Sequence, residues 1–156
     1  MKTDKDELEI TQMRPEDAAE VAAIERMTFS LPWSEQGFLS SLQSQDTVYL
    51  TVRQKGKLIA YCGFLQSFEE ADITNVAVHP DFRGKGIGYT MLCELMERGR
   101  KRGVERYTLE VRAGNAHAIR LYRKLGFESI GIRKNFYEKP KEDAVIMWTQ
   151  SEDANG

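Results

Sequence analysis

The stretch that most constrains the fold is Arg83-Gly84-Lys85-Gly86-Ile87-Gly88, which places three glycines within five positions. Glycine lacks a Cβ atom, so the backbone N–H groups of such a loop can approach a ligand closely. From Ile87 onward, apolar residues recur at helical spacing until basic residues and Gly103 end the segment, which predicts a helix. A short β-branched run, residues 73–78, precedes the loop. The unit is therefore strand, glycine-rich loop and helix, and the amides at the helix start predict a site for an anion, most often phosphate.

The spacing of the glycines excludes two familiar phosphate-binding motifs. A P-loop requires Ser or Thr after its lysine, but Gly86 follows Lys85. The dinucleotide fingerprint requires G-x-G-x-x-G, and the third glycine, Gly88, comes one residue early. The spacing that remains is R-x-x-G-x-G, starting at Arg83. A plain tight turn before a helix is the alternative interpretation, and the preceding strand and the long following helix favour a binding loop.

Length and composition indicate one globular domain, spanning 1–156 with a core of about 8–150. The chain has 156 residues, of which 41% are hydrophobic and 29% charged, values typical of a protein that buries a sizeable core. The net charge of −2 gives no global footprint for nucleic acid. The longest apolar run, residues 58–65, is too short to span a bilayer. We therefore expect neither a nucleic-acid nor a membrane partner, and a monomer or weak oligomer.

The cysteines and the chain ends suggest the compartment. Cys62 and Cys93 lie in apolar surroundings without metal-ligand spacing, and we expect both to be buried reduced thiols. No apolar stretch follows the charged residues 1–7, so we expect no signal peptide and a cytoplasmic location. The histidines are not spaced as a metal pair, and no metal is expected. The first six or so residues and residues 151–156 are expected to be frayed.

The rest of the chain alternates between strand and helix patterns in a mixed order. Such an order favours the α/β (α+β) class, with a mixed sheet of about seven strands flanked on both faces by about four helices. Residues 136–140 are expected to form a loop between the last two strands. The expected elements are strands at 8–13, 48–52, 58–68, 73–78, 107–111, 127–133 and 144–149, and helices at 15–29, 34–42, 87–102 and 115–125.

Two residues in these elements could carry acid–base chemistry. Glu110 is a carboxylate within a short apolar strand, on the same face as Thr108 and Arg112. It is either a half-exposed surface residue or a general base, acting directly or through water. Tyr122 has the spacing of a core residue, although its phenol could protonate a thiolate if it projected into a cleft. Asn115 is a natural N-cap for the helix of Tyr122, and a ligand contact is the alternative for its side chain.

The glycine loop resembles the pyrophosphate loop of the GNAT superfamily of acetyl-coenzyme A-dependent acetyltransferases, and the predicted element order matches the GNAT fold from end to end. Further segments make the chain similar to the RimI-type ribosomal-protein-alanine N-acetyltransferases. They are Pro32-Trp33-Ser34-Glu35, residues 109–115, residues 118–127, Ile132-Arg133-Lys134-Asn135-Phe136-Tyr137 and residues 142–147. The Leu-Tyr-x-x-x-Gly-Phe part, ending at Phe127, is common across GNAT enzymes, whereas the other segments lie where peptide-binding loops would be.

The resemblance implies a role for each matched residue. It makes Glu110 the proton acceptor and Tyr122 the proton donor, with strands splayed at the acetyl-CoA site. It implies Trp33 and Tyr137 as walls of the peptide site. The implied acetyl-CoA contacts are Val76, Ala77, Val78, Arg83, Gly84, Lys85, Gly86, Ile87, Gly88, Tyr89 and Asn115.

The implied substrate is the N-terminal alanine of the eighteenth small-subunit ribosomal protein, with other protein N-termini or lysines as alternatives. Two departures concern the peptide side: Phe136-Tyr137 stands where the family often has two tyrosines, and the loop after Tyr137 is short and lysine-rich. A small-molecule acetyltransferase, for a polyamine or an aminoglycoside, would share every acetyl-CoA residue. A coenzyme A-binding protein without turnover is a further alternative, against which the presence of both Glu110 and Tyr122 counts.

Overall fold

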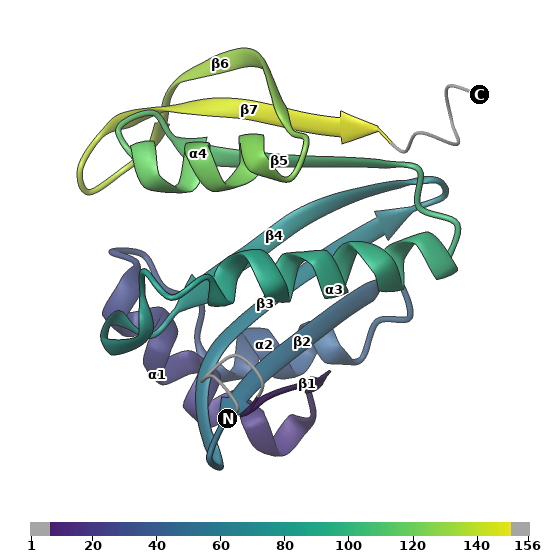
Figure 1. Ribbon diagram of the computed structural model, residues 1–156. Helices are drawn as coiled ribbons and strands as arrows, with labels where there is room; N and C mark the ends of the chain where they lie inside the picture. Colours follow the sequence, from purple (N-terminus) through teal and green to yellow (C-terminus); the bar gives the residue numbers. More distant parts are fainter. Residues whose placement is uncertain (1–6, 151–156) are drawn as a thin grey trace.

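The computed structural model describes residues 7–150. The ends that we expected to be frayed, residues 1–6 and 151–156, lie outside the described residues. Seven strands form one mixed sheet in the order β1-β2-β3-β4-β5-β7-β6 (Figure 1). The strands are β1 Leu8–Gln12, β2 Thr47–Gln54, β3 Lys57–Ser67, β4 Glu70–Val78, β5 Arg106–Arg112, β6 Glu128–Tyr137 and β7 Glu142–Gln150. The helices within this range are α1 Ala18–Thr28, α2 Glu35–Leu42, α3 Ile87–Lys101 and α4 Ala116–Lys124, with short 3-10 turns at Pro15–Asp17 and Pro80–Phe82.

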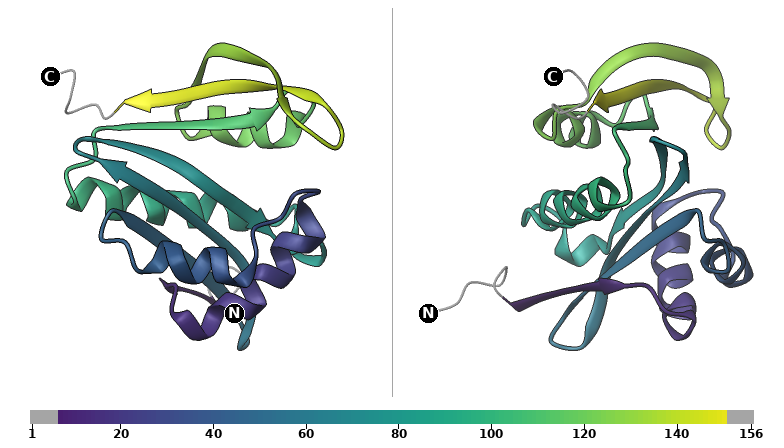
Figure 2. Two further views of the ribbon diagram at one scale, coloured as in Figure 1. Left: turned by 180° about the vertical axis from the view of Figure 1, so that it is seen from behind. Right: turned by 90° about the vertical axis from the view of Figure 1, so that its right-hand side faces the viewer.

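Helices cover both faces of the sheet, as the sequence predicted (Figure 2). The α1–α2 face buries a cluster that includes Val21, Phe38 and Tyr61. The α3–α4 face buries a larger cluster that includes Met91, Leu92 and Leu95 of α3. Successive side chains of a strand point to opposite faces, so the central strands β2, β3 and β4 contribute to both layers, with Leu50 in one and Tyr49 in the other as an example from β2. The apolar spacing that predicted α3 therefore corresponds to its contact with the sheet.

Strands β4 and β5 start as neighbours and then diverge. They are parallel and paired only from Glu70, which lies opposite Arg106, to Asp72, which lies opposite Thr108. Beyond this point β4 continues to Val78 and β5 to Arg112 without pairing to each other. Figure 1 shows the two strands separating toward one end of the sheet. The predicted parallel crossover and the splayed strands are both confirmed.

A bulge in β4 lies where the strands separate. The β3–β4 register shifts between Gly63 and Phe64, which leaves Thr74 as the extra residue of β4. The hydroxyl of Tyr49 on β2 lies 3.1 Å from Thr74 Oγ1 and donates to Asn75 Oδ1, also at 3.1 Å. A Cβ atom on Gly63 would lie 2.2 Å from the Tyr49 ring, so glycine makes room for this side chain. Tyr49 thus anchors the bulge from the neighbouring strand.

The predicted residues at the helix ends are confirmed as caps and stops. Ser34 accepts a hydrogen bond from Gly37 N at 3.1 Å and caps α2, and Asn115 accepts one from Ala118 N at 3.1 Å and caps α4. The glycine stop after α3 is present, with Gly103 at φ +85°. Pro15 begins a 3-10 turn that leads into α1, rather than α1 itself.

Two predictions were wrong. Phe136 and Tyr137 belong to β6 and not to the following loop, because a bulge between Arg133 and Tyr137 carries the strand past the polar residues that suggested its end. Asn135 in this bulge has φ +55°, and its N–H donates to Asp143 Oδ1 at 2.8 Å. Cys62 is buried as expected, but Cys93 is exposed, because it lies on the flank of α3 that borders a surface hollow with Leu8 and Ile10 of β1.

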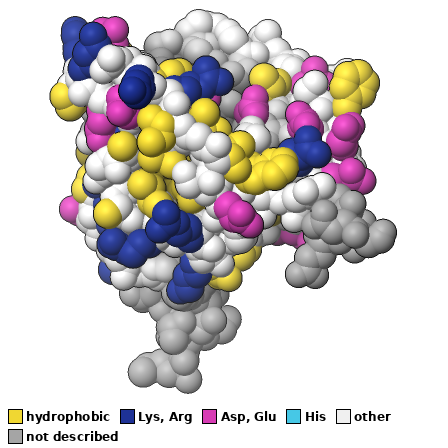
Figure 3. Space-filling model, turned by 90° about the horizontal axis from the view of Figure 1, so that it is seen from above, with side chains coloured by type: hydrophobic (Ala, Val, Ile, Leu, Met, Phe, Trp, Pro, Cys, Tyr) yellow, Lys and Arg dark blue, Asp and Glu magenta, His cyan; other side chains and the backbone are white. Residues whose placement is uncertain are grey.

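The edge strand β6 leaves several hydrophobic side chains exposed. Ile130, Ile132 and Phe136 are 53%, 61% and 46% exposed. Seen from above, with the β6 edge of the sheet toward the viewer, hydrophobic side chains lie among basic and acidic ones (Figure 3).

No helix between residues 7 and 150 has both the length and the apolar character needed to cross a membrane.

Candidate active site

The glycine loop has the backbone conformation that its sequence predicted. Gly84 and Gly86 both have φ +78°, in the left-handed region that glycine adopts without strain. Gly86 is the N-cap of α3, and no side chain caps its amides. The first amides of α3, from Ile87 to Tyr89, therefore remain available for an anion. Gly88 has a packing role as well, because a Cβ atom there would lie 3.3 Å from Leu121 Cδ2 on α4.

Basic side chains surround this loop. Arg83 Nε donates to the carbonyl oxygen of Val78 at 3.0 Å, and Nη2 lies 3.5 Å from Thr28 Oγ1 at the end of α1. Lys85 Nζ lies 5.4 Å from the centre of the Phe82 ring. Lys124 of α4 lies 5.2 Å from the centre of the Tyr89 ring, and Tyr89 is 38% exposed. The helix start, its free amides and these cations together favour a negatively charged group.

The backbone of β4 directs polar groups toward the space between the diverging strands. His79 N donates to the Ile59 carbonyl oxygen at 2.7 Å, so these two residues form a hydrogen-bonded antiparallel pair. Hydrogen-bonded and non-hydrogen-bonded pairs alternate along an antiparallel ladder, so Val78 and Val76 stand in non-hydrogen-bonded pairs. Their N–H and C=O groups therefore point away from β3 and toward β5. Ala77 is the exception among the three predicted contacts, because it pairs with Tyr61 and its N–H points toward β3.

Glu110 and Tyr122 approach this space from opposite faces of the sheet. Leu109 and Val111 are buried in the α3–α4 layer, so Glu110 between them projects toward the α1–α2 face. Tyr122 on α4 is 7% exposed and packs on Phe127, with ring centres 5.8 Å apart. Burial raises the pKa of Tyr122, and the nearby Tyr137 and Cys62 add to this effect. The phenol therefore stays protonated at neutral pH.

The side chains around Glu110 come from β5, β6 and β7. Arg133 Nε on β6 lies 3.6 Å from Glu110 Oε1. Arg112 lies 4.5 Å from the centre of the Tyr137 ring, and its Nη1 donates to Glu142 Oε1 at 3.2 Å. The pKa of Tyr137 is raised, first by burial and then by the negative charge of Glu110. Tyr137 thus lies within electrostatic reach of both Glu110 and Tyr122, which the strand assignment alone did not predict.

Trp33 lies on the loop between α1 and α2, and four hydrophobic side chains are exposed on this loop and the last turn of α1. Met27, Phe29, Leu31 and Trp33 are 37% to 58% exposed. Both this loop and the β6–β7 turn lie at the end of the sheet where β4 and β5 diverge (Figures 1 and 2). The two segments therefore flank the α1–α2 side of the opening.

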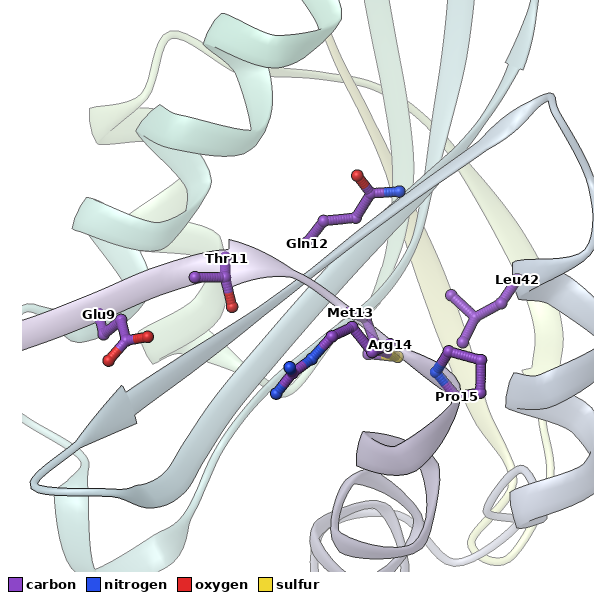
Figure 4. Close-up of a pocket in the computed structure, with 7 residues that line it drawn as sticks. All are labelled: Glu9, Thr11, Gln12, Met13, Arg14, Pro15 and Leu42. Atoms are coloured by element: carbon purple, nitrogen blue, oxygen red, sulfur yellow. The ribbon is translucent and has the colours of Figure 1, made fainter.

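A separate surface hollow lies beside β1, three strands away from β4 in the sheet order (Figure 4). No predicted site residue lines this hollow. Its lining residues are Glu9, Thr11, Gln12, Met13, Arg14, Pro15 and Leu42. Among residues 7–150, no three histidine, cysteine or acidic side chains gather as a metal site would require.

Comparison with known proteins identifies the family. The family model "Acetyltransferase (GNAT) family" matches residues 18–127, which is most of the chain. The chain belongs to the GNAT acetyltransferase family. It is an acetyl-CoA-dependent N-acetyltransferase, and residues 18–127 include β4, the glycine loop, Glu110 and Tyr122.

Individual relatives agree with this assignment. The chain is 38% identical over 140 residues to the ribosomal protein bS18-alanine N-acetyltransferase of Escherichia coli strain K12, covering 88% of this chain and 94% of that protein. The corresponding protein of Haemophilus influenzae is 33% identical over 141 residues, covering 88% and 95%. The crystal structure of the ribosomal-protein-S18-alanine N-acetyltransferase from Escherichia coli aligns with a TM-score of 0.86 at 36% identity, covering 92% of this chain and 93% of that chain.

Proposed function

We propose that this enzyme transfers an acetyl group from acetyl-CoA to the N-terminal alanine of ribosomal protein bS18. The observation that carries the proposal is the 38% identity over 140 residues to an enzyme named for this reaction. The similarity extends beyond the acetyl-CoA loop that GNAT enzymes share, because it covers 88% of the chain. The substrate is a cytoplasmic protein, so the reaction is expected in the cytoplasm, with the enzyme acting as a monomer or weak oligomer.

The chain fits acetyl-CoA in two places. The free amides of Gly84 to Tyr89, with Arg83 and Lys85 beside them, suit the pyrophosphate. The N–H and C=O of Val76 and the N–H of Val78, which face away from β3, suit the amides of the pantetheine arm and the thioester oxygen, whereas the Val78 carbonyl already accepts from Arg83. The side-chain oxygen of Asn115 is engaged as the cap of α4. A contact between Asn115 and acetyl-CoA would therefore come from the N-terminal turn of α4. Acetyl-CoA supplies the acetyl group as a thioester.

The opposite placement of Glu110 and Tyr122 suits direct transfer. The acceptor amine enters from the α1–α2 face, where Glu110 accepts a proton from it, directly or through water. As the new N–C bond forms, the C–S bond breaks on the α3–α4 face. Tyr122, protonated at neutral pH because burial raises its pKa, donates its proton to the departing sulfur. The base and the acid therefore serve different reactants without competing for one proton.

The segments that flank the α1–α2 side would form the peptide site. Trp33 and Tyr137 supply its aromatic walls, and the small alanine side chain fits a narrow entrance between them. Glu142 and Asp143 are occupied by Arg112, Gly114 and Asn135, so they shape the β6–β7 turn rather than offering free charges to a basic peptide. Glu35, exposed in the first turn of α2 just after Trp33, is the candidate for attracting the basic residues that follow alanine. Glu69 lies in the β3–β4 turn, at the end of the sheet where β4 and β5 are still paired, and therefore away from this opening.

The test compares four synthetic acceptors with the purified enzyme and acetyl-CoA. The first is a peptide with the bS18 N-terminal sequence, beginning with alanine and a basic residue. The second peptide has a blocked N-terminus and one internal lysine, and the third has glutamate at the second position. The fourth acceptor is a free polyamine. We expect efficient acetylation of the first peptide only. Acetylation of the polyamines or the lysine peptide in its place would reject the proposed substrate and leave the acetyltransferase assignment intact.

A further inference from the structure

A buried carboxylate outside the proposed acid–base pair joins the peptide-side loop to the sheet. Glu25 on α1 is 3% exposed. Its Oε2 accepts a hydrogen bond from the backbone N–H of Trp33 at 3.0 Å, and its Oε1 accepts one from the hydroxyl of Tyr61 on β3. A buried carboxylate requires such donors, since leaving it unpaired is costly. The two bonds tie the loop after α1 to the central strand β3.

The connection from Glu25 continues to the acetyl-transfer region. Tyr61 pairs in register with Ala77, which lies between the two β4 residues whose backbone groups face the diverging strands. Phe38 packs on Trp33, with ring centres 5.3 Å apart, and edge-on against Tyr61 at 5.6 Å. Burial raises the pKa of Tyr61, and its hydrogen bond to Glu25 raises it further, so the phenol remains a donor at neutral pH. The loop position is thus set by buried contacts rather than by its own exposed side chains.

We propose that Glu25 is a positioning residue that fixes the position of Trp33 beside the entrance for the acceptor peptide and thereby sets the affinity for the peptide. The inference rests on the proposed function only in taking the acceptor to be a protein N-terminus. Glu25 does not take part in proton transfer, because both its oxygens are engaged inside the α1–α2 layer. Its geometry matters, and its charge does not.

Two substitutions separate geometry from charge. Glu25→Gln keeps the length of the side chain: its oxygen can accept from Trp33 N–H, and its amide can donate to the Tyr61 hydroxyl, which also accepts hydrogen bonds. Glu25→Asp keeps the charge but withdraws the oxygens by about 1.5 Å, the length of one carbon–carbon bond. We expect Glu25→Asp to raise the peptide KM by about tenfold while kcat and the acetyl-CoA KM stay near wild type. Glu25→Gln should restore a near-wild-type peptide KM.

Asp17 provides a control for disturbing the hydrogen bonds of a different buried carboxylate. It is 1% exposed and also accepts two hydrogen bonds, from Arg14 N and Arg53 Nη2, each at 2.8 Å. It lies eight residues before Glu25, about 12 Å along the helix direction. Asp17→Asn should lower the melting temperature and leave the peptide KM unchanged. A peptide KM that rises as much in Asp17→Asn as in Glu25→Asp would show a general loss of stability and overturn the positioning role.

A second measurement needs no peptide substrate. In a Trp148→Phe background, Trp33 is the only tryptophan of the chain. Acrylamide should quench its fluorescence more in Glu25→Asp than in Glu25→Gln, because the loop is released only in the former. Equal quenching, or loss of peptide affinity in Glu25→Gln with retention in Glu25→Asp, would reject the proposal. If the wild-type enzyme fails to acetylate the bS18 peptide, the proposed substrate fails, and the quenching result still decides the role of Glu25.

Discussion

The guanidinium of Arg133 lies beside the carboxylate of Glu110, with Nε 3.6 Å from Oε1. The side chains of Arg133 and Glu110 are 57% and 30% exposed, so water screens the pair. Pairs of this kind contribute about 0–1 kcal/mol. Glu110 is therefore held mainly by the pairing of β5 with β7, and it can accept a proton without breaking a strong ion pair.

This relationship predicts different effects for the two residues. Glu110→Gln should lower kcat by about 100- to 10,000-fold, as expected for loss of a general base, and should abolish the acidic limb of the pH–rate profile. Arg133→Gln should change kcat by about fivefold or less, in line with the small energy of the pair. Steady-state kinetics with the bS18 peptide at several pH values measure both. A wild-type profile for Glu110→Gln would make Glu110 an ordinary strand residue.

Tyr122 should act on the chemical step and not on acetyl-CoA binding. Tyr122→Phe removes the hydroxyl and keeps the ring that packs on Phe127, so the fold should persist. We expect kcat to fall by about 100-fold or more with an acetyl-CoA affinity close to that of wild type. Calorimetric titration with a non-reactive coenzyme A analogue separates the two quantities. A matching loss of affinity would assign Tyr122 to binding instead of proton donation.

The glycine loop can be tested against another glycine of the same conformation. Gly86 at φ +78° and Gly56 at φ +81° both suffer strain when valine replaces them, and Gly56 belongs to the β2–β3 turn, outside the glycine loop. Gly86→Val should weaken acetyl-CoA binding by about tenfold or more, because the side chain also stands over the amides of α3. Gly56→Val should lose a similar amount of stability, about 1–2 kcal/mol, with unchanged binding. Equal affinities in both variants would remove the loop from the site.

Gly63 and Tyr49 carry a prediction about the β4 bulge. Alanine at position 63 would place its Cβ 2.2 Å from the Tyr49 ring, so the ring must move and lose its contacts with Thr74 and Asn75. We expect Gly63→Ala to cost about 1–3 kcal/mol in the free energy of unfolding, measured by urea denaturation. Tyr49→Phe in the Gly63→Ala background should add little further loss, since the hydroxyl contacts are already broken. Additive losses would show that the ring keeps its place.

The sequence predicted the elements better than it predicted the peptide side of the site. Hydrophobic periodicity and caps act locally, so α2 and α4 with their caps Ser34 and Asn115 were predictable, and so was the glycine loop. The end of β6 was not, because its bulge depends on Asp143 binding Asn135 N across the strand pair. Glu25 has helical spacing among apolar residues and looked like one more member of α1. Its partners Trp33 and Tyr61 are 8 and 36 positions away, a separation that no local pattern encodes.

Alkaline pH should destabilise this protein through its buried tyrosines. Burial raises the pKa values of Tyr49, Tyr61, Tyr107, Tyr122 and Tyr137. An unfolded tyrosine titrates at about 10, so above that pH the unfolded chain loses protons that the folded chain keeps. The stability from these groups is therefore fully present below pH of about 10 and declines as the pH rises further.

Tyr107 isolates the contribution of one such group, because it lies at the start of β5, away from the glycine loop, and donates to the Met96 carbonyl oxygen at 2.9 Å. Above pH of about 10, each tyrosine that stays protonated only in the fold contributes up to about 1.4 kcal/mol per pH unit to the decline. Tyr107→Phe should make the decline shallower by up to that amount, although its stability at pH 7 is lower than wild type. Urea unfolding from pH 8 to 11, followed together with tyrosinate absorbance, measures both slopes. Parallel slopes for the variant and the wild type would mean that Tyr107 titrates alike in the folded and unfolded chains.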